Sequence, residues 1–203
     1  MVTQGELGEI VTGVPKYPHL FLQGRVLIEE AFPMMMKRYT KNQVCCFSGY
    51  RPEKLGLGDA EAFLRGEIER SICRAVQAGC HVFMTGMSRG FDLWAARTVL
   101  GMREELGVEL WSVVPYDGID RSWNENWRER YHEVLFSAER VYCLEMRYKP
   151  GCFYKRNSFM VENSCRLICY YDGIPGGTEY TVQQARKFGL EIDNLADRQL
   201  VLW

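Results

Sequence analysis

The sequence predicts an α/β fold in which helices cover both faces of a mainly parallel sheet. Three observations favour this class. Short apolar runs that suit buried strands alternate with longer stretches whose apolar residues recur at helical spacing. Loops containing glycine or proline separate the two kinds of stretch. At 203 residues, 47% of them hydrophobic, the chain is long enough to bury one sizeable core.

The first part of the chain predicts an extension followed by a strand, a helix and a second strand. Residues 1–42 carry scattered glycine and proline, with a possible helix at 25–39 that Pro33 interrupts. The apolar run 44–47 is the first expected strand. In 60–78 apolar residues recur every three or four positions, which indicates one buried helix face, and the run that starts at Val82 is the second strand.

The middle of the chain repeats this alternation. Gly90 opens a helix, and 108–114 is the third strand. Ser122 is expected to cap the next helix, in which aromatic and apolar residues fall four apart over 123–135 and indicate a core-facing stripe. The run 141–144 is the fourth strand.

The last part of the chain supplies a helix at 153–163, a fifth strand at 167–171 and a final helix that stops at Gly189. Strands that alternate with helices in this way form parallel β-α units with right-handed crossovers. We therefore expect a Rossmann-like three-layer sandwich with about five or more strands. It forms a single domain over 43–203, with 1–42 packed on it or partly irregular.

Composition limits the partners and the compartment. Lys and Arg total 25 against 26 Asp and Glu, so a net charge of −1 gives no general attraction to nucleic acid or acidic membranes, and no apolar run is long enough to span a bilayer. Eight cysteines lie mostly in apolar runs, with Cys152 expected in a loop, and no secretory leader pattern precedes them. We expect a cytoplasmic protein. Without a Cys-x-x-Cys pair or ligand spacing among the histidines, no metal site is predicted.

The loops that follow the strands gather at the carboxyl edge of the sheet, where open α/β sheets bind ligands. Three of them combine glycine with hydroxyl or cationic groups, a composition that suits a phosphate. The candidate ligand-binding residues are Ser48, Gly49, Arg51, Gly86, Ser88, Arg89, Gly90, Asp92, Arg156, Asn157, Gly176, Gly177 and Thr178.

Structural alternatives remain open for these residues. The glycines could serve only to turn the chain and to let helices pack closely. Asp92 could be stabilised simply by the first turn of its helix, and at the start of the helix with Arg156 and Asn157 the charge could belong to a surface salt bridge. Neither the G-x-x-x-x-G-K-[ST] loop nor the G-x-G-x-x-G fingerprint with its acidic residue is present, which argues against the familiar ATP and dinucleotide sites.

The chain resembles the YpsA-like family of the SLOG superfamily, which is bacterial and Rossmann-like and related to the lonely-guy phosphoribohydrolases and to DprA. The likeness covers about 44–192 and rests on CCFSGYRPEKL, TGMSRGFDLWAA, VVPYDG, YKRNSFMV and GGT. It implies a nucleotide or nucleotide derivative as ligand, bound by 86–90 and by Gly177 and Thr178. The sequence departs from the family pattern at Tyr50, Ser88 and Cys165.

The comparison with the lonely-guy enzymes can be made residue by residue. Their arginine matches Arg156, but their catalytic glutamate falls on Thr181, so that hydrolase mechanism lacks its main participant. Glu179 lies on another face of the same helix. No catalytic group is therefore assigned.

We expect a sensor or regulatory domain that binds a small nucleotide-derived ligand. The alternative is a nucleotide-processing hydrolase or transferase, with Asp92 or Glu179 as acid or base and Arg156 on the phosphate. Binding of single-stranded DNA, as in DprA, is a weaker alternative. A homodimer is plausible because sheets of this class have exposed edges. The resemblance places an ordinary start near Met36, so we also expect that residues 1–35 come from an over-extended gene start.

Overall fold

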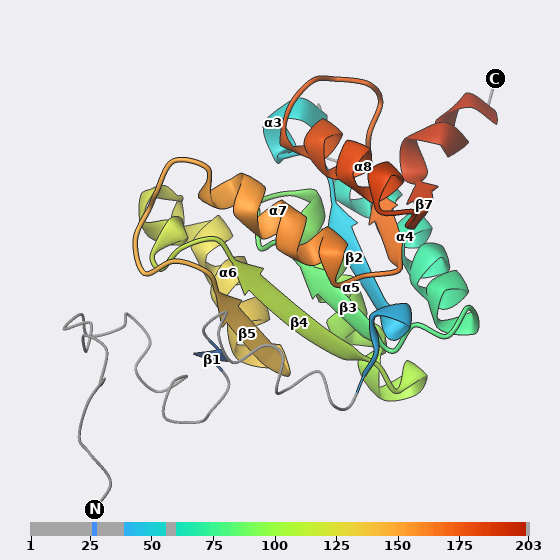
Figure 1. Cartoon of the computed structure of the whole chain (residues 1–203), viewed down its shortest axis with the longest axis horizontal. Helices are drawn as coiled ribbons and strands as arrows, with labels where there is room; N and C mark the ends of the chain where they lie inside the picture. The colour runs from blue at the N-terminus through green and yellow to red at the C-terminus, as the bar shows by residue number, and fades with distance from the viewer. Residues whose placement is uncertain (1–25, 28–38, 56–59, 202–203) are drawn as a thin grey trace, which may run out of the picture.

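The structure, a computed structural model, describes residues 26–27, 39–55 and 60–201 (Figure 1). Within these residues seven strands form one sheet, and every neighbouring pair is parallel. The strands are β1 (Val26–Leu27), β2 (Val44–Ser48), β3 (Val82–Thr85), β4 (Glu109–Val114), β5 (Arg140–Cys143), β6 (Arg166–Cys169) and β7 (Glu191–Asn194). Their order across the sheet is β1-β5-β4-β3-β2-β6-β7.

Helices cover both faces of this sheet, which confirms the predicted α/β Rossmann-like class (Figure 1). On one face α4 packs against α5 and α5 against α6, whereas α7 and α8 pack together on the other. The α-helices are α3 (Pro52–Leu55), α4 (Ala60–Gln77), α5 (Phe91–Leu106), α6 (Glu125–Ser137), α7 (Cys152–Glu162) and α8 (Gly177–Lys187). Short 3-10 helices lie at η2 (Lys41–Gln43), η3 (Ile119–Ser122) and η4 (Leu195–Val201).

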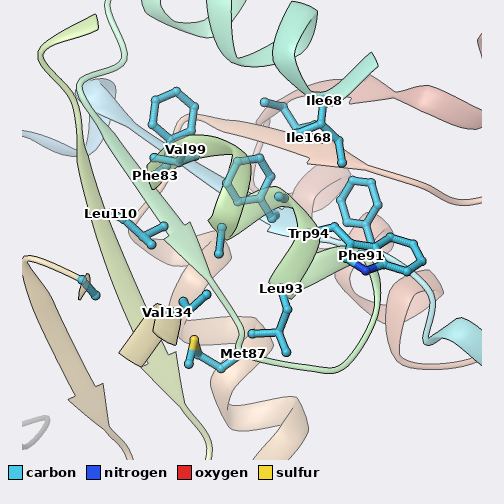
Figure 2. Close-up of a cluster of buried hydrophobic side chains, with 14 of the residues drawn as sticks. Ile68, Phe83, Met87, Phe91, Leu93, Trp94, Val99, Leu110, Val134 and Ile168 are labelled. Atoms are coloured by element: carbon cyan, nitrogen blue, oxygen red, sulfur yellow. The ribbon is translucent and has the colours of Figure 1, made fainter. Parts of the chain in front are cut away.

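Two apolar clusters hold the three layers together. Side chains alternate along β2, so Cys45 and Phe47 enter the cluster under α4, α5 and α6, while Val44 and Cys46 enter the one under α7 and α8. Full burial of one large apolar side chain contributes roughly 1.5–3 kcal/mol. Figure 2 shows part of the first cluster, with labelled side chains from α4, α5, α6, β3, β4, β6 and the loop before α5: Ile68, Phe83, Met87, Phe91, Leu93, Trp94, Val99, Leu110, Val134 and Ile168.

Three local predictions are wrong. Ser122 does not cap α6, because it ends η3; the N-cap is Asn124, whose side-chain oxygen accepts a 3.1 Å hydrogen bond from the backbone N–H of Trp127. Cys152 does not lie in a loop, because it is the first residue of α7 and is 2% exposed. Val26 and Leu27 are not helical, because they form β1 beside β5.

The rest of the helix predicted at 25–39 cannot be compared in the same way. Residues 25 and 28–38 lie outside the described residues, as does Met36 with nearly all of the segment upstream of it. The two residues of β1 belong to the expected extension 1–42 and pair in parallel with Val141 and Tyr142 of the sheet.

The order of the strands creates a switch point between β2 and β6. From β2 onward the chain adds β3, β4 and β5 on one side, and then crosses the sheet through α7 to place β6 and β7 on the other. After β2 the chain leaves toward α4 on one face, and after β6 it leaves toward α8 on the opposite face. The loops at the carboxyl ends of β2 and β6 therefore diverge, and such a divergence leaves a crevice that suits a ligand.

Candidate functional site

A pocket of about 410 Å³ lies at this switch point. Its walls come from the loop after β2 with α3, from the start of α5, from α7 and from the first turn of α8. The residues that line it are Ser48, Gly49, Tyr50, Arg51, Glu53, Lys54, Ser88, Asp92, Phe153, Arg156, Asn157, Gly177 and Thr178. The structure thus brings together most of the candidate residues, from loops more than a hundred positions apart in the chain.

Four candidates stay outside this lining: Gly86, Arg89, Gly90 and Gly176. Gly86 directly follows β3, Gly90 is the N-cap of α5, and Gly176 is the N-cap of α8. Arg89 turns to a neighbouring cavity, where its Nη2 lies 2.8 Å from Oε1 of Glu53 and its guanidinium 5.8 Å from the centre of the Trp123 ring.

Arg156 is the buried cation of the pocket. Its side chain is 7% exposed, and Nη1 donates to the carbonyl oxygen of Gly86 while Nη2 donates to Oγ of Ser88 at 3.2 Å. Nη1 also lies 3.5 Å from Oδ2 of Asp92. Nε of Arg156 is also buried, and it has no hydrogen-bond partner within the described part of the chain. Burial lowers the pKa of Arg156, although the Asp92 carboxylate opposes this shift.

Asp92 is the carboxylate that balances this cation. It lies in the first turn of α5, is nearly fully buried, and accepts a 3.3 Å hydrogen bond from the backbone N–H of Ser88. Burial raises the pKa of Asp92, while Arg156 and the N–H of Ser88 oppose that shift. The pair links α5 to α7 across the sheet, so neither group is a solvated surface charge.

Three of the candidate glycines are required by close packing. A Cβ atom on Gly86 would stand 1.9 Å from Nη1 of Arg156, and one on Gly49 would stand 2.3 Å from Cγ of Phe91. Gly90 has a positive φ of 86°, and its Cβ would lie 2.7 Å from the carbonyl oxygen of Tyr50. These contacts support the packing alternative for these positions. The lack of a side chain at Gly86 leaves the space that the guanidinium of Arg156 occupies, and this space is called the Arg156 seat.

The opposite wall is the N-terminus of α8. Gly177 and Thr178 are its first two residues. The N-cap, Gly176, has no side chain that could accept a hydrogen bond from the first backbone N–H groups of the helix. Asn157 fixes this end from α7, because its Nδ2 donates to the carbonyl oxygen of Gly177 at 3.2 Å. An uncapped helix N-terminus carries a partial positive charge that favours anions.

Neither Thr181, at the position of the lonely-guy glutamate, nor the nearby Glu179 supplies a carboxyl group to the pocket. Thr181 is buried, and its hydroxyl donates to the carbonyl oxygen of Gly177 at 2.9 Å. Glu179 is half-exposed and is not among the residues that line the pocket.

Sequence reasoning missed four lining residues: Tyr50, Glu53, Lys54 and Phe153. The signal for α3 was Pro52, because proline is favoured at the first position of a helix. A helical turn there brings Lys54 over the ring of Tyr50, at 5.5 Å from its centre, and lets Nζ donate to the carbonyl oxygen of Pro175 at 3.2 Å. Figure 1 shows α3 beside the loop that leads into α8.

Tyr50 joins the two loops of the switch point. Its hydroxyl donates to Oδ1 of Asp172 at 2.7 Å and accepts from the backbone N–H of Ile174 at 3.2 Å. Burial, reinforced by the Asp172 carboxylate, raises the pKa of Tyr50 to about 12. The hydroxyl is therefore a neutral structural link between the β2 and β6 loops.

The described residues contain no group of three or more His, Cys, Asp or Glu side chains placed to hold a metal ion. In the same residues, no helix combines the length and apolar character needed to cross a membrane. The pocket instead has three cationic side chains, Arg51, Lys54 and Arg156, against the carboxylates of Glu53 and Asp92.

Comparison with known proteins gives relatives in sequence. A family model named YpsA, described as the YspA SLOG family, matches residues 45–197. A UPF0398 protein of Bacillus velezensis is 29% identical over 153 residues, which cover 71% of this chain and 84% of that protein. A UPF0398 protein of Bacillus cereus is also 29% identical, over 75% of this chain and 86% of its own length.

Solved structures give likenesses in fold. DNA processing protein A from Helicobacter pylori, a protein with a described single-stranded DNA binding mode, has a TM-score of 0.52 at 15% identity, over 79% of this chain and 72% of that one. DNA processing protein A from Streptococcus pneumoniae has a TM-score of 0.51 at 16% identity, over 76% of this chain but half of its own. At such identities these likenesses support the Rossmann-like fold.

Proposed function

The chain belongs to the YpsA SLOG family, and on that premise we propose that its switch-point pocket binds a nucleotide-derived ligand through a phosphate group. The protein acts as a cytoplasmic sensor or regulatory domain. Its eight cysteines are all free thiols, which supports a reducing compartment.

The observation that carries the proposal is the unpaired donor of Arg156. A buried N–H without a partner costs roughly 1–3 kcal/mol, and Nε of Arg156 is such a group on a residue that lines the pocket. A phosphate oxygen accepts from guanidinium N–H groups and is also favoured at the N-terminus of α8 on the opposite wall. A phosphate bound between these two walls would be favoured by both.

Binding without reaction is favoured over nucleotide processing. Thr181 stands where the lonely-guy enzymes have their glutamate, and its hydroxyl is committed to its own helix. Asp92 is the partner of Arg156, and Glu179 lies off the pocket lining. The nucleotide-processing alternative would therefore need Asp92 to leave its ion pair.

Binding of single-stranded DNA is the second candidate, favoured by the likeness to the two DNA processing proteins. At the start of α7, Tyr148 and Tyr154 are exposed, and aromatic side chains between cations can stack on bases. Lys149 and Lys155 in this segment share the single carboxylate of Glu145, which offsets part of their charge. This candidate ranks second because the chain has a net charge of −1, which gives no general attraction to nucleic acid.

The test combines calorimetry with thermal unfolding on the full chain. The probes are inorganic phosphate, nucleoside monophosphates of the four common bases and a single-stranded oligonucleotide, with chromatography to detect products. A bound nucleotide should raise the melting temperature by mass action. Turnover of a nucleotide would contradict the sensor function and support the nucleotide-processing alternative. Binding of the oligonucleotide alone would favour binding of single-stranded DNA.

Substitutions of two pocket arginines test where the phosphate group of the ligand binds. Arg156→Ala should weaken nucleotide binding by roughly 10- to 150-fold, since a hydrogen bond to a charged group contributes about 1.5–3 kcal/mol. Arg51→Ala, at an exposed position that tolerates replacement, should weaken it about tenfold. Arg65→Ala is the matched control, because Arg65 is 71% exposed on α4 and pairs only with Glu69 among the described residues. Unchanged affinity in both pocket variants would refute the proposal.

A further inference from the structure

We propose that Cys80 and Cys165 form a redox-sensitive thiol pair, which a peroxide converts into a disulfide that ties two segments of the fold together. Neither cysteine lines the candidate pocket, so this inference stands independently of the proposed function. Cys165 is also one of the positions at which the sequence departs from the family pattern. The pair is therefore a feature of this chain rather than one that the family implies.

The two cysteines lie at the amino edge of the sheet, beside the start of β2. Cys165 directly precedes β6, Cys80 lies two residues before β3, and β2 pairs with both strands. The backbone N–H of Cys165 donates to the carbonyl oxygen of Val44 at 2.9 Å. That of His81 donates to the carbonyl oxygen of Gln43 at 2.8 Å. Both segments are therefore fixed next to each other, at the edge of the sheet opposite the pocket.

The two sulfur atoms are already neighbours. Sγ of Cys80 and Sγ of Cys165 lie 4.0 Å apart, whereas a disulfide bond is about 2.05 Å long, so the atoms need to approach by about 2 Å. Sγ of Cys165 also lies 3.2 Å from the carbonyl oxygen of Asn42, and a thiol is only a weak donor to such a group. This weak contact leaves the Cys165 side chain able to rotate toward Cys80.

The two thiols differ in their access to an oxidant. Cys165 is partly exposed, whereas Cys80 is 1% exposed. Burial raises the pKa of the Cys80 thiol, and Cys165 adds to the rise, although Arg166 opposes it. Cys80 therefore stays a protonated thiol at neutral pH, and Cys165 is the sulfur that meets a peroxide first.

The oxidation has two steps. In the first, Cys165 loses its proton and its thiolate attacks one oxygen of hydrogen peroxide; the O–O bond breaks, hydroxide leaves and takes up a proton as water, and a sulfenic acid remains. In the second, the sulfur of Cys80 attacks the sulfenic sulfur; the S–O bond breaks, and the leaving hydroxide takes the Cys80 proton to form a second water. The two thiols thus lose two electrons and two protons, and one peroxide is reduced to two waters.

The resting and oxidised states follow from the compartment and from the place of the pair in the chain. All eight cysteines are free thiols in the structure, and disulfides of cytoplasmic proteins are typically transient and redox-sensing. A bond between residues 85 positions apart stabilises the fold chiefly by restricting the unfolded chain. The bond therefore forms and stabilises the protein when peroxide rises, and it reopens when cellular thiols reduce it.

The experiment oxidises the full chain. Reduced protein is freed of reductant and treated with hydrogen peroxide, its remaining thiols are alkylated in denaturant, and its peptides are mapped by mass spectrometry. Before alkylation the mass should fall by about 2 Da, the two hydrogens lost with one disulfide. Two of the eight cysteines should escape alkylation, in a peptide pair joined through Cys80 and Cys165, and dithiothreitol should restore both. The oxidised protein should also melt roughly 5–15 °C higher.

Two variants complete the test. Cys165→Ser should keep its remaining thiols reduced under the same treatment and show no rise in melting temperature. Cys73→Ser is the matched control, because it removes another partly exposed thiol, on α4, and should still form the bond. Absence of the joined peptide pair in the wild type, or loss of two thiols in Cys165→Ser as well, would overturn the inference. A mapped bond without a rise in melting temperature would overturn its role as a tie between the two segments.

Discussion

Replacing Gly86 with alanine should disturb the candidate site, because the added methyl group would meet the ion pair of Arg156 and Asp92. The new Cβ would stand 1.9 Å from Nη1 and 2.7 Å from Cζ of Arg156, and 2.8 Å from Oδ2 of Asp92. Arg156 is buried, so its guanidinium cannot simply swing into solvent without losing its bonds to Gly86 and Ser88. Overpacking of this kind costs roughly 1–3 kcal/mol of unfolding free energy.

The affinity for the ligand should fall when Gly86→Ala displaces the guanidinium of Arg156. A guanidinium moved out of its seat no longer aims its N–H groups at a phosphate, so Gly86→Ala should also weaken nucleotide binding roughly 10- to 150-fold. Urea unfolding followed by circular dichroism gives the free energy of unfolding, and calorimetry gives the affinity. Gly101→Ala is the matched control: nothing lies within 4 Å of its Cβ position in α5, so it should raise stability by up to about 1 kcal/mol.

The two measurements together test the role of the Arg156 seat. A Gly86→Ala protein with wild-type stability and wild-type affinity would mean that Arg156 neither packs against Gly86 nor contacts the ligand. A loss of stability with unchanged affinity would keep the packing argument and remove Arg156 from the phosphate site.

Three further changes probe the surrounding structure. Gly49→Ala should lower the free energy of unfolding by roughly 1–3 kcal/mol, because its Cβ would meet the ring of Phe91, and an unchanged urea midpoint would contradict this. Asn124→Ala should cost about 1 kcal/mol by removing the cap on the N–H of Trp127, measured in the same way; a loss below a few tenths would show that the cap is unimportant. The stabilisation from the Tyr50 hydroxyl is complete below pH 10 and is lost as pH rises toward its folded pKa of about 12. The stability difference between wild type and Tyr50→Phe should therefore narrow between these values, and a constant difference would argue against the raised pKa.

The sheet was predictable where apolar runs mark its strands. β2, β3 and β6 are almost wholly buried, and a strand covered on both faces must be apolar along its whole length. β7 (Glu191–Asn194) escaped prediction because it is a mostly polar edge strand with little burial to mark it. The helix caps were less predictable: Ser122 and Asn124 have equal capping chemistry, and the turn of η3 decides between them.

The position of the candidate site in the fold was predictable, but the roles of its individual residues were predictable only in part. Parallel strands bring their carboxyl ends to one edge, so Ser48, Asp92 and Thr178 were expected near one another and all line the pocket. The roles of the glycines were not readable, because whether a Cβ clashes depends on side chains from distant segments, such as Arg156 against Gly86. The ion pair of Arg89 with Glu53 was hidden for the same reason.

The pocket also has a consequence for how the chain can be divided. Eight of its thirteen lining residues, including Arg51 and Asp92, precede the turn at Gly107, and the other five, including Arg156 and Thr178, follow it. Gly107 is exposed between α5 and β4, so a cut there leaves each fragment with one side of the site. A ligand that contacts both sides should promote reassociation of the two fragments, which makes the protein a natural scaffold for a split reporter of its own ligand.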